Sequence, residues 1–588
     1  MQRPQKKHKK IGILIWGGLL ATIIIASCAK TSPLSGGPKD TTPPIVENST
    51  PPNYATNFKT NEIEIEFNEF IQLEGVNQKL MVSPPLDNDP EINSRGKSLI
   101  IEINDQLKEN TTYSFYFADA IVDLHESNPI ENFQYVFSTG EKVDSMKTSG
   151  KVVNAYNKKP AADIYVMLYT RKSDSVPMKH RPLYITKTNE NGVFELTNLK
   201  DTIYKIFALD DVNANYLYDL PNEKIAFTDS IIKPNQVTIM KSYKIADTAS
   251  KDSLKIPGAD ASEGDTLKSS PESASGSDTL ILDLFRDRDT TLKITTSKME
   301  EDEKVILGFN KPVDTLAIKP LQPKMKQNWY LPEWNQVNDS VLLWLTDFDS
   351  DSLVLTFSMD SRLTDTLTFT YFKEAEEKQR KRAKRGLKIT PQLQKNIQIP
   401  AYPMMLDFSK PLAGVPFKRD SLFLYSSEDT NKVAYEQNGI RQVQIDYSWK
   451  DEMNYRLYIP DSTFTDIFGN SNDSTVLKFS TKPKDEYGTL IVNASVPDTT
   501  KNYIINLLSK DEKTNYKTTV IRRDTTLKFK FLDPGKYKLK TIVDRNKNNV
   551  WDAGLYIKHE QPEEVIYYED VIEIMANWEI EYDWKIKP

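Results

Sequence analysis

Two segments of the sequence place oxygen-bearing side chains at one regular spacing. The first carries Asp211, Asn213, Asn215 and Asp219, and the second carries Asp544, Asn546, Asn548 and Asp552. Carboxylate and amide oxygens are the ligands that a hard cation such as Ca²⁺ prefers, and short side chains in a tight loop can converge on one ion. The spacing therefore predicts a calcium site in each segment.

Each segment resembles the beginning of the EF-hand type of calcium loop but departs from it at three points. The sixth position holds Tyr216 or Asn549 in place of glycine, the twelfth holds Asn222 or Leu555 in place of glutamate, and asparagine twice replaces aspartate. The low charge predicts weak binding. The alternative is a hairpin connection in which the Asp and Asn side chains accept hydrogen bonds from their own backbone. We expect no required cofactor.

Residues suited to catalysis are sparse. The histidines downstream of the N-terminal segment are His125, His180 and His559, and none has a neighbour at zinc-ligand spacing. Because the sequence also lacks a GxSxG motif and a glycine-rich phosphate loop, we expect no enzymatic activity. The alternative is a carboxylate-dependent hydrolase built from paired acids such as Asp349–Ser352 or Glu374–Glu377, because sequence spacing does not reveal the distance between carboxyl groups.

Aromatic residues suggest a second alternative, glycan binding. The candidates are Trp329, Tyr330, Trp334, Trp578 and Trp584. Exposed rings can stack on sugar faces, but rings at strand positions more often fill the core of a β-sandwich. The core interpretation is favoured.

The one cysteine of the chain, Cys28, follows a segment typical of export signals. Five basic residues precede the uncharged run Ile11–Ile25, and the small residues Ala26 and Ser27 stand directly before Cys28, which resembles a lipobox. The resemblance implies that residues 1–27 are a signal peptide and that Cys28 is acylated. The alternative is a signal-anchor helix, but the run is shorter than the about 20 residues of a membrane span.

Net charge argues against nucleic acid as a partner. The full chain carries −7, and removal of residues 1–27 takes away five basic and no acidic residues, which leaves −12. Binding to nucleic acid requires a concentrated basic surface. With Cys28 acylated, no thiol remains for disulfides or metal binding.

Residues 28–43 are rich in Pro, Gly, Ser and Thr and predict a tether. In lipoproteins of the Bacteroidota type, an acidic cluster after the cysteine marks export to the surface, and no acidic residue precedes Asp40. Ala29 also differs from the aspartate that retains some lipoproteins in the inner membrane. The resemblance implies the outer membrane, with the periplasmic face favoured over the cell surface.

Residues 44–140 show the period-two pattern of β-strands with one buried face. Ile63, Ile65 and Phe67 alternate with glutamates. This stretch resembles the bacterial Ig-like domain of surface-layer and envelope proteins through Phe67–Phe70, Leu107–Tyr113, Asp123–Asn128 and Phe137–Gly140. The resemblance implies an antiparallel β-sandwich and no particular activity.

The Ig-like pattern returns at residues 388–484, where Leu406 and Phe408 correspond to Ile65 and Phe67. A weaker third copy is expected at 280–373, where Val305, Leu307 and Phe309 alternate but the closing motif is missing. These repeats predict tandem sandwiches.

A second kind of repeat follows each of the two well-formed Ig-like units, at residues 141–245 and 485–588. From Phe194 onward the two copies align at a single offset, and the Asp/Asn segments correspond within them. These units resemble the transthyretin-like or carboxypeptidase-regulatory β-sandwich. We therefore expect an all-β protein of tandem antiparallel sandwiches, Ig-like and transthyretin-like.

Two interruptions divide this series. Residues 246–279 are rich in Ser, Asp, Ala and Gly and predict a disordered linker. Residues 374–387 combine helix formers with a basic end and predict a charged helical spacer, the alternative being contact of Arg380–Lys388 with lipid phosphates. We expect these interruptions to let the two halves of an articulated rod reorient.

The sequence thus predicts a non-catalytic, lipid-anchored envelope protein that presents β-sandwiches to a partner. Candidate partners are an outer-membrane β-barrel or its assembly machinery, a secretion or motility apparatus, and cell-wall glycan. The membrane contact is expected through the N-terminal lipid, and no nucleic acid is expected.

Overall fold

The computed structural model describes residues 39–234, 280–300, 304–346, 348, 350, 352–359, 363–370, 386–414 and 422–587. Cys28, the signal peptide 1–27, most of the tether 28–43, the linker 246–279 and nearly all of the spacer 374–387 lie outside them. The described residues form mainly antiparallel sheets with very little helix, which confirms the all-β prediction. Within these residues no helix has the length and apolar character needed to cross a bilayer.

The first sandwich pairs sheet β1-β2-β6-β5 with sheet β4-β7-β9, and the small ladder β3-β8 lies beside them. Its elements are β1 (Val46–Thr50), β2 (Glu62–Phe67), β3 (Ile71–Leu73), α2 (Val76–Lys79), β4 (Met81–Ser83), β5 (Glu91–Arg95), β6 (Ser98–Glu102), β7 (Thr112–Tyr116), β8 (Ile121–Asp123) and β9 (Gln134–Ser138). In β2, Ile63, Ile65 and Phe67 are fully buried while the intervening glutamates are exposed, which confirms the predicted alternation.

The second sandwich contains sheets β13-β10-β16 and β12-β11-β14-β15. Its elements are β10 (Met146–Asn154), β11 (Tyr165–Tyr169), α3 (Val176–Lys179), β12 (Tyr184–Lys187), β13 (Val193–Leu199), β14 (Lys205–Asp210), β15 (Lys224–Phe227) and β16 (Ile281–Leu284). It packs against the first sandwich, where the Ile185 amide donates a hydrogen bond of 3.1 Å to the Ser83 hydroxyl.

Strand β16 shows that the second sandwich continues past residue 280, where the sequence placed the start of the third. It runs parallel to β10, with Lys151 opposite Ile281, and Leu282 and Leu284 are buried in the core of the second sandwich. The linker 246–279 therefore connects two strands of one sandwich, β15 and β16, instead of joining two domains. The sequence could not predict this pairing, because the local pattern of a four-residue strand does not indicate which distant strand it pairs with.

The third sandwich pairs sheet β17-β18-β21-β20 with sheet β19-β22-β23. Its strands are β17 (Ile294–Glu300), β18 (Lys304–Phe309), β19 (Leu316–Gln322), β20 (Tyr330–Trp334), β21 (Ser340–Leu345), β22 (Ser352–Met359) and β23 (Leu363–Thr370). The predicted alternation of Val305, Leu307 and Phe309 lies in β18, where all three side chains are buried.

The fourth sandwich pairs sheet β24-β26-β30-β29 with sheet β25-β32-β31-β27-β28. Its strands are β24 (Ile389–Pro391), β25 (Ile397–Gln398), β26 (Met404–Phe408), β27 (Leu422–Tyr425), β28 (Thr430–Val433), β29 (Glu436–Gln437), β30 (Gln442–Ile445), β31 (Asn454–Ile459) and β32 (Thr475–Thr481). The first, third and fourth units share one four-strand order in the first sheet, so the three are repeats of one architecture.

The fifth sandwich follows the short helix η1 (Lys484–Glu486) and pairs sheet β36-β33-β40 with sheet β35-β34-β37-β38, to which β39 adds on β37. Its elements are β33 (Gly488–Ser495), β34 (Asn502–Ser509), β35 (Asn515–Ile521), β36 (Thr525–Leu532), β37 (Gly535–Asp544), η2 (Tyr556–Lys558), β38 (Val565–Tyr567), β39 (Ile572–Ile574) and β40 (Glu579–Lys585). The strand order matches that of the second sandwich, including the parallel last strand, β40 beside β33.

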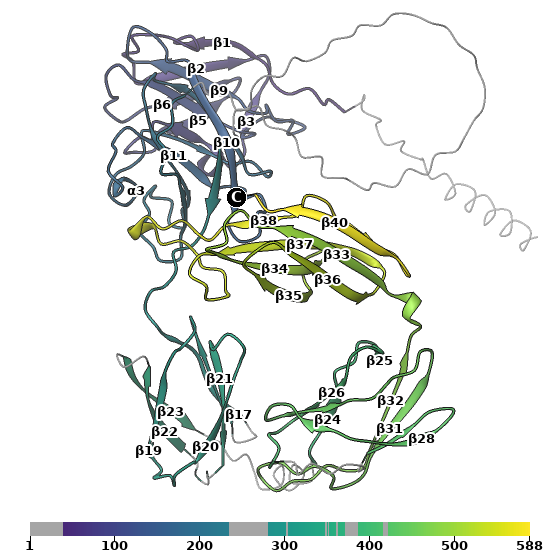
Figure 1. Cartoon of the computed structure of the whole chain (residues 1–588). Coiled ribbons are helices and arrows are strands. Elements are labelled where there is room, and N and C mark those ends of the chain that lie inside the picture. The colour runs from purple at the N-terminus through teal and green to yellow at the C-terminus, as the bar shows by residue number, and fades with distance from the viewer. Residues whose placement is uncertain are drawn as a thin grey trace, which may run out of the picture.

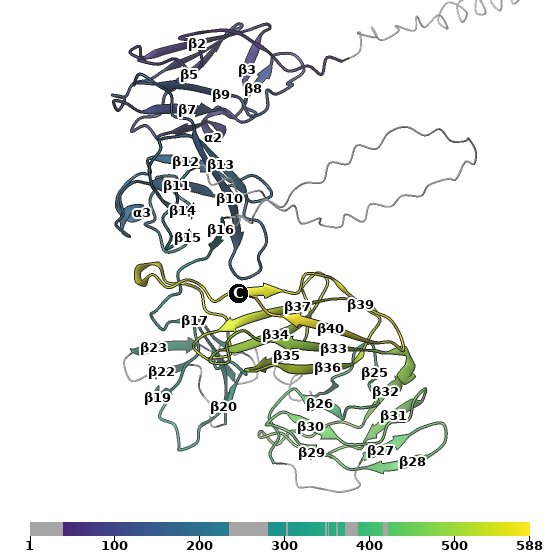
Figure 2. The ribbon, with the colours of Figure 1, turned by 45° about the horizontal axis from the view of Figure 1, so that its top comes forward.

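The chain doubles back on itself. Figures 1 and 2 both place the fifth sandwich between the second sandwich and the pair formed by the third and fourth. The third and fourth sandwiches meet through Arg441, whose Nε lies 2.9 Å from both carboxylate oxygens of Glu333. The fourth and fifth meet where the ring of Tyr402 lies 5.9 Å from that of Phe531. Contacts therefore join the third sandwich to the fourth and the fourth to the fifth.

Candidate functional site

The first Asp/Asn segment forms the loop between β14 and β15. A carboxylate oxygen of Asp211 accepts a hydrogen bond of 2.7 Å from the Tyr216 amide, and the Asn215 side-chain oxygen accepts one of 2.7 Å from the Leu217 amide. The amide groups of Asn213 and Asn215 both donate to Asp219, at 3.2 and 2.8 Å. The structure therefore brings Asn213 and Asn215 to Asp219, while Asp211 contacts the backbone of the same loop.

The second segment forms the corresponding loop after β37. Asp544 is fully buried, and its two carboxylate oxygens accept hydrogen bonds from the Lys547 amide at 2.6 Å and the Asn549 amide at 2.9 Å. Asn546 and Asn548 both donate from their side chains to Asp552. The two loops thus share one internal arrangement.

Each loop also contains a buried glutamate that the sequence analysis missed. Glu223 is fully buried and accepts hydrogen bonds of 3.0 Å from the Asp219 and Leu220 amides. Glu563 is 2% exposed and accepts one of 2.7 Å from the Arg545 amide and one of 3.2 Å from the Asp552 amide. Burial raises the pKa of the Glu563 carboxyl.

The spacing explains why this glutamate was missed. Glu223 follows Asp219 by four residues, whereas Glu563 follows Asp552 by eleven, so a single alignment offset does not pair them. The position of each glutamate could have identified it, because each one stands just before the strand that follows the loop, β15 or β38.

The hydrogen bonds of both loops are those expected of Asx-turns, in which side-chain oxygens accept from backbone amides. One atom stands apart: the Oδ1 oxygen of Asp211 is buried without a hydrogen-bond partner, whereas both oxygens of Asp544 are occupied. Across the described ranges, no group of three or more His, Cys, Asp or Glu residues has metal-binding geometry. Calcium binding, which would also use asparagine oxygens, stays a prediction. Of the two loops, the first is the better candidate, because its Asp211 Oδ1 accepts no hydrogen bond.

The longer spacing in the second loop creates a segment that reaches the second sandwich. We call residues 551–561 the latch. Tyr556 in the latch is 1% exposed and joins a cluster formed by one face of sheet β12-β11-β14-β15. Its ring lies 5.9 Å from Phe207, 5.8 Å from Tyr218 and 5.1 Å from Phe227, all edge-on. The fifth sandwich thereby inserts an aromatic side chain into the second.

Polar contacts surround the Tyr556 ring. Its hydroxyl donates to the Asp174 carbonyl oxygen, and its amide donates to the Asp287 carboxylate at 2.8 Å. The buried hydroxyl has a raised pKa because burial disfavours the phenolate. Both polar groups of Tyr556 are therefore satisfied inside the contact.

Flanking residues of the latch add further contacts with the second sandwich and the segment that follows it. Glu560 forms an ion pair with Arg288, and the Gln561 side chain donates to the Phe227 carbonyl oxygen at 3.0 Å. The His559 Nε2 atom lies 3.1 Å from the Asp174 carboxylate. At Gly554 a Cβ atom would lie 2.5 Å from the Phe285 ring, so only glycine permits this approach.

A second contact between the same two sandwiches centres on Lys540. Its ammonium lies 3.4 Å from the centre of the Tyr156 ring, and the ring of Tyr156 in turn lies 5.0 Å from that of Trp551. The Lys540 side chain is 3% exposed, and burial lowers its pKa to about 8 although the nearby Glu512 opposes the shift. A cation over an aromatic face is attracted by the ring quadrupole.

These contacts correct the expectation that the two halves reorient freely. The latch and Lys540 join the second sandwich to the fifth, and Arg441 joins the fourth to the third across the spacer 374–387. The sequence could not show this, because contacts between domains leave no periodic signal along the chain.

The aromatic candidates for glycan binding are mostly core residues. Trp329 and Trp584 are 6% and 4% exposed, and Tyr330 and Trp334 pack partly buried against the core of the third sandwich. Trp578 is 56% exposed. The core interpretation is confirmed for Trp329 and Trp584.

The candidates for catalysis are dispersed. The His125 amide donates to Asp123 in the first sandwich, the His180 ring contacts Arg171 in the second, and His559 lies in the latch beside Asp174. The paired acids Asp349–Ser352 and Glu374–Glu377 lie almost entirely outside the described residues.

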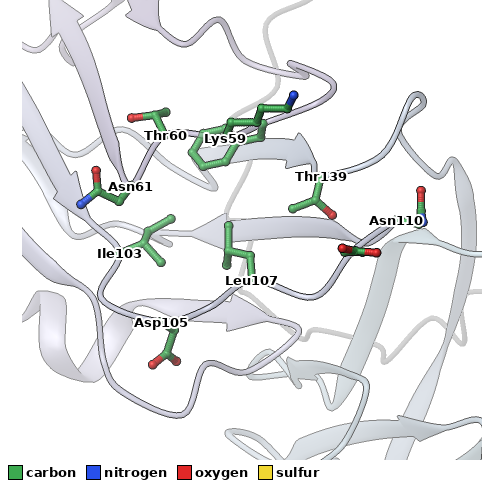
Figure 3. A pocket seen from close by; sticks show the side chains of 10 residues that line it. Lys59, Thr60, Asn61, Ile103, Asp105, Leu107, Asn110 and Thr139 are labelled. Carbon is green, nitrogen blue, oxygen red and sulfur yellow. The ribbon is translucent and has the colours of Figure 1, made fainter.

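A hollow of about 590 Å³ opens at one end of the first sandwich, with Asn110 and Thr139 on one side of it and Asp105 on the other (Figure 3). Burial alone would raise the pKa of Asp105, but hydrogen bonds from Asn88 and Asp87 outweigh it and lower the pKa. A carboxyl group held ionised in this way is unsuited to act as a general acid.

Comparison with known proteins finds a family likeness for the first sandwich. Residues 40–139 match the family model described as a bacterial Ig-like domain. No curated protein matches the chain.

Several solved structures show limited likeness. The Bacillus anthracis TIE protein is 11% identical over 97% of this chain and 78% of its own, with a TM-score of 0.13. The surface-layer protein SbsC, domains 1–6, is 9% identical over 86% of this chain and 66% of its own, with a TM-score of 0.13. BcpA, the major pilin subunit of Bacillus cereus, is 8% identical over 75% and 99%, with a TM-score of 0.14. These scores carry no argument about function.

Replacement of Tyr556 by alanine should open the contact between the second and fifth sandwiches. Loss of a buried aromatic side chain removes about 3–5 kcal/mol of packing free energy. We expect a larger radius of gyration in small-angle X-ray scattering and faster proteolysis near residue 556. The control is Ile557→Ala, because the neighbouring Ile557 is 70% exposed. Identical scattering curves for Tyr556→Ala and the unmodified chain would contradict the latch.

Lys540 should make the stability of the protein depend on alkaline pH. Its pKa is about 8 in the folded protein, against about 10.4 in an unfolded chain. Between these values the unfolded chain binds more protons, so the free energy of unfolding should rise with pH by up to about 1.4 kcal/mol per unit. Urea unfolding at pH 7.5 and 9.5 should show this rise in the unmodified chain and lose it in Lys540→Met. The exposed Lys510, changed to methionine, should leave it in place.

Proposed function

We propose that the protein is a non-catalytic, lipid-anchored structural or interaction protein of the bacterial envelope. The match of the first sandwich to bacterial Ig-like domains supports a structural or binding role. The export signal and the small residues before Cys28 support an anchor at the outer membrane. The periplasmic face is favoured over the cell surface.

The observation that carries this proposal is the contact of the latch with the second sandwich. A buried aromatic ring with both polar groups satisfied, a buried lysine over Tyr156 and an ion pair hold two domains together that are far apart in sequence. Such a contact gives a chain of small sandwiches a fixed shape. A scaffold needs a fixed shape, because it must hold its binding surfaces at a set distance from the anchor.

The fixed shape separates the anchored end from the distal end. The tether leads into the first sandwich, whereas the third and fourth sandwiches lie on the far side of the fifth (Figure 2). The distal pair is therefore the part that meets a partner. Candidate partners are an outer-membrane β-barrel or its assembly machinery, a secretion or motility apparatus, and cell-wall glycan.

We also propose weak calcium binding at the first Asp/Asn loop as a stabilising feature of this scaffold. The buried Asp211 oxygen without a partner supports it, and the nearby Asp219 and Glu223 supply further negative charge. The second loop has its Asp544 oxygens occupied and is the weaker candidate.

Replacement of Cys28 by serine should release the protein from the membrane fraction, because serine cannot be acylated in its place. Fractionation of cells followed by immunoblotting would measure this, and the control is Ser27→Ala, which keeps a small residue before the cysteine. A Cys28→Ser protein that remains with the membranes would contradict the lipid anchor.

Millimolar calcium should raise the melting temperature of the purified chain, because a ligand that binds the folded state at ten times its Kd stabilises it by about 1.4 kcal/mol. Asp211→Asn should abolish the shift, whereas Asp544→Asn should retain most of it. The measurement is thermal unfolding with calcium and with sodium chloride of equal ionic strength. No shift with calcium beyond that with sodium would contradict calcium binding.

A further inference from the structure

A cleft of about 860 Å³ lies where the fourth sandwich meets the fifth. One wall is the segment around β25 in the fourth sandwich, and the other is formed by the edge strands β35 and β36 with the turn into β37 in the fifth. Clefts between domains are common ligand sites because two surfaces can enclose one molecule.

Aromatic rings from both sandwiches face this cleft. Tyr402 of the fourth sandwich is 46% exposed and Tyr516 of the fifth is 45% exposed. Between the walls, the Phe531 ring lies 5.9 Å from Tyr402 and 5.8 Å from Tyr487. The cleft therefore offers two accessible rings, supported by packed rings, on opposite sides.

The cleft is also basic in a protein whose net charge is −7. Lys395, Lys517, Lys530 and Lys536 line it, and within the described part of the chain none forms an ion pair. Lys482 pairs with Asp533 at 3.2 Å. Four uncompensated ammonium groups around one cleft favour an anionic ligand.

A buried hydroxyl at the cleft wall lacks a partner. Tyr487 lines the cleft and is 6% exposed, and its hydroxyl makes no hydrogen bond. Leaving a buried polar group unsatisfied costs about 1–3 kcal/mol. The wall covers this hydroxyl, so Tyr487 contributes to the cleft through its ring, which packs against Phe531.

We propose that this cleft binds an acidic polysaccharide, namely a chain of sugars that carry carboxylate groups. The rings of Tyr402 and Tyr516 would stack on the apolar faces of the sugars, and the four lysines would neutralise the carboxylates. The inference deepens the proposed function, an envelope interaction protein, by naming the chemistry of one partner.

An acidic peptide fits the cleft less well. A peptide would bind by adding a strand to the edge strand β35, but the pairing of β35 with β34 shifts register between Leu507 and Leu508, and Lys517 is exposed on the edge. Bulges and exposed lysines are features that block pairing at a sheet edge.

The test is binding of three probes of similar length to the purified full-length chain in detergent. The probes are an oligogalacturonate, a neutral maltooligosaccharide and polyglutamate, measured by isothermal titration calorimetry at low and at physiological salt. We expect the oligogalacturonate to bind at least about tenfold more tightly than either other probe, a difference of about 1.4 kcal/mol, and to weaken as salt rises. Because the measurement does not depend on membrane attachment, its failure is distinguishable from failure of the lipid anchor.

Variants test the location. Tyr402→Ala and Tyr516→Ala should each weaken binding of the oligogalacturonate by about tenfold, and Lys530→Gln by about threefold, from the loss of stacking or of one charge. Trp578→Ala and Lys478→Gln change an exposed ring and an exposed lysine outside the cleft and should have no effect. Equal binding of polyglutamate or of the neutral sugar, no binding of the oligogalacturonate, or unchanged binding by the cleft variants would overturn the proposal.

Discussion

The arrangement of this protein depends on one constraint: sheet β12-β11-β14-β15 is apolar on both faces. Along β11 and β14, Val166, Leu168 and Ile206 enter the core of the second sandwich, while Met167, Tyr169 and Phe207 point to the opposite side. A sheet of an isolated sandwich needs only one apolar face. The second face must be removed from water, and Tyr556 of the fifth sandwich, Phe285 and the rings of the Asp/Asn loop cover it. The position of the fifth sandwich follows from this requirement.

The two Asp/Asn loops belong to repeated sandwiches, and the loop of the second copy has changed so that it binds the first copy. Both keep a first aspartate that accepts from a backbone amide and two asparagines that donate to the last aspartate. Both also end on a buried glutamate that accepts from the amide of that last aspartate. The second loop contains additional residues between Asp552 and Glu563, and these form η2 with Tyr556. The conserved hydrogen bonds fix the base of the loop, so the added residues project from a rigid support. A fixed base is what lets Tyr556 reach a neighbouring domain in one conformation.

The sequence predicted what depends on local periodicity. The alternation in β2 and β18 identified strands and their buried faces, and the repeated Asp/Asn spacing identified residues that do lie together. It did not predict what depends on distant pairing. The parallel pairing of β16 with β10, across the linker 246–279, has no counterpart in local pattern, and Tyr556 stands in a loop where an aromatic residue gives no sign of its partner. Glu563 was missed because the intervening residues changed its spacing from Asp552.

The latch also determines which surfaces of the fifth sandwich remain available. The end of the fifth sandwich that carries Lys540 and Tyr556 packs against the second sandwich. The edge strands β35 and β36 of the fifth sandwich therefore face the fourth sandwich. Edge strands are hazardous when exposed, because their unpaired backbone groups can recruit another chain. Here the fourth sandwich covers them in part, and exposed lysines such as Lys517 and Lys530 border the remaining gap. Charges that protect an edge against pairing with another protein are, by the same chemistry, attractive to an anionic ligand that lacks a peptide backbone. The second apolar face of sheet β12-β11-β14-β15 therefore positions the fifth sandwich, and this position leaves β35 and β36 facing the fourth. The lysines on these edges then make a basic cleft in a chain that is acidic as a whole.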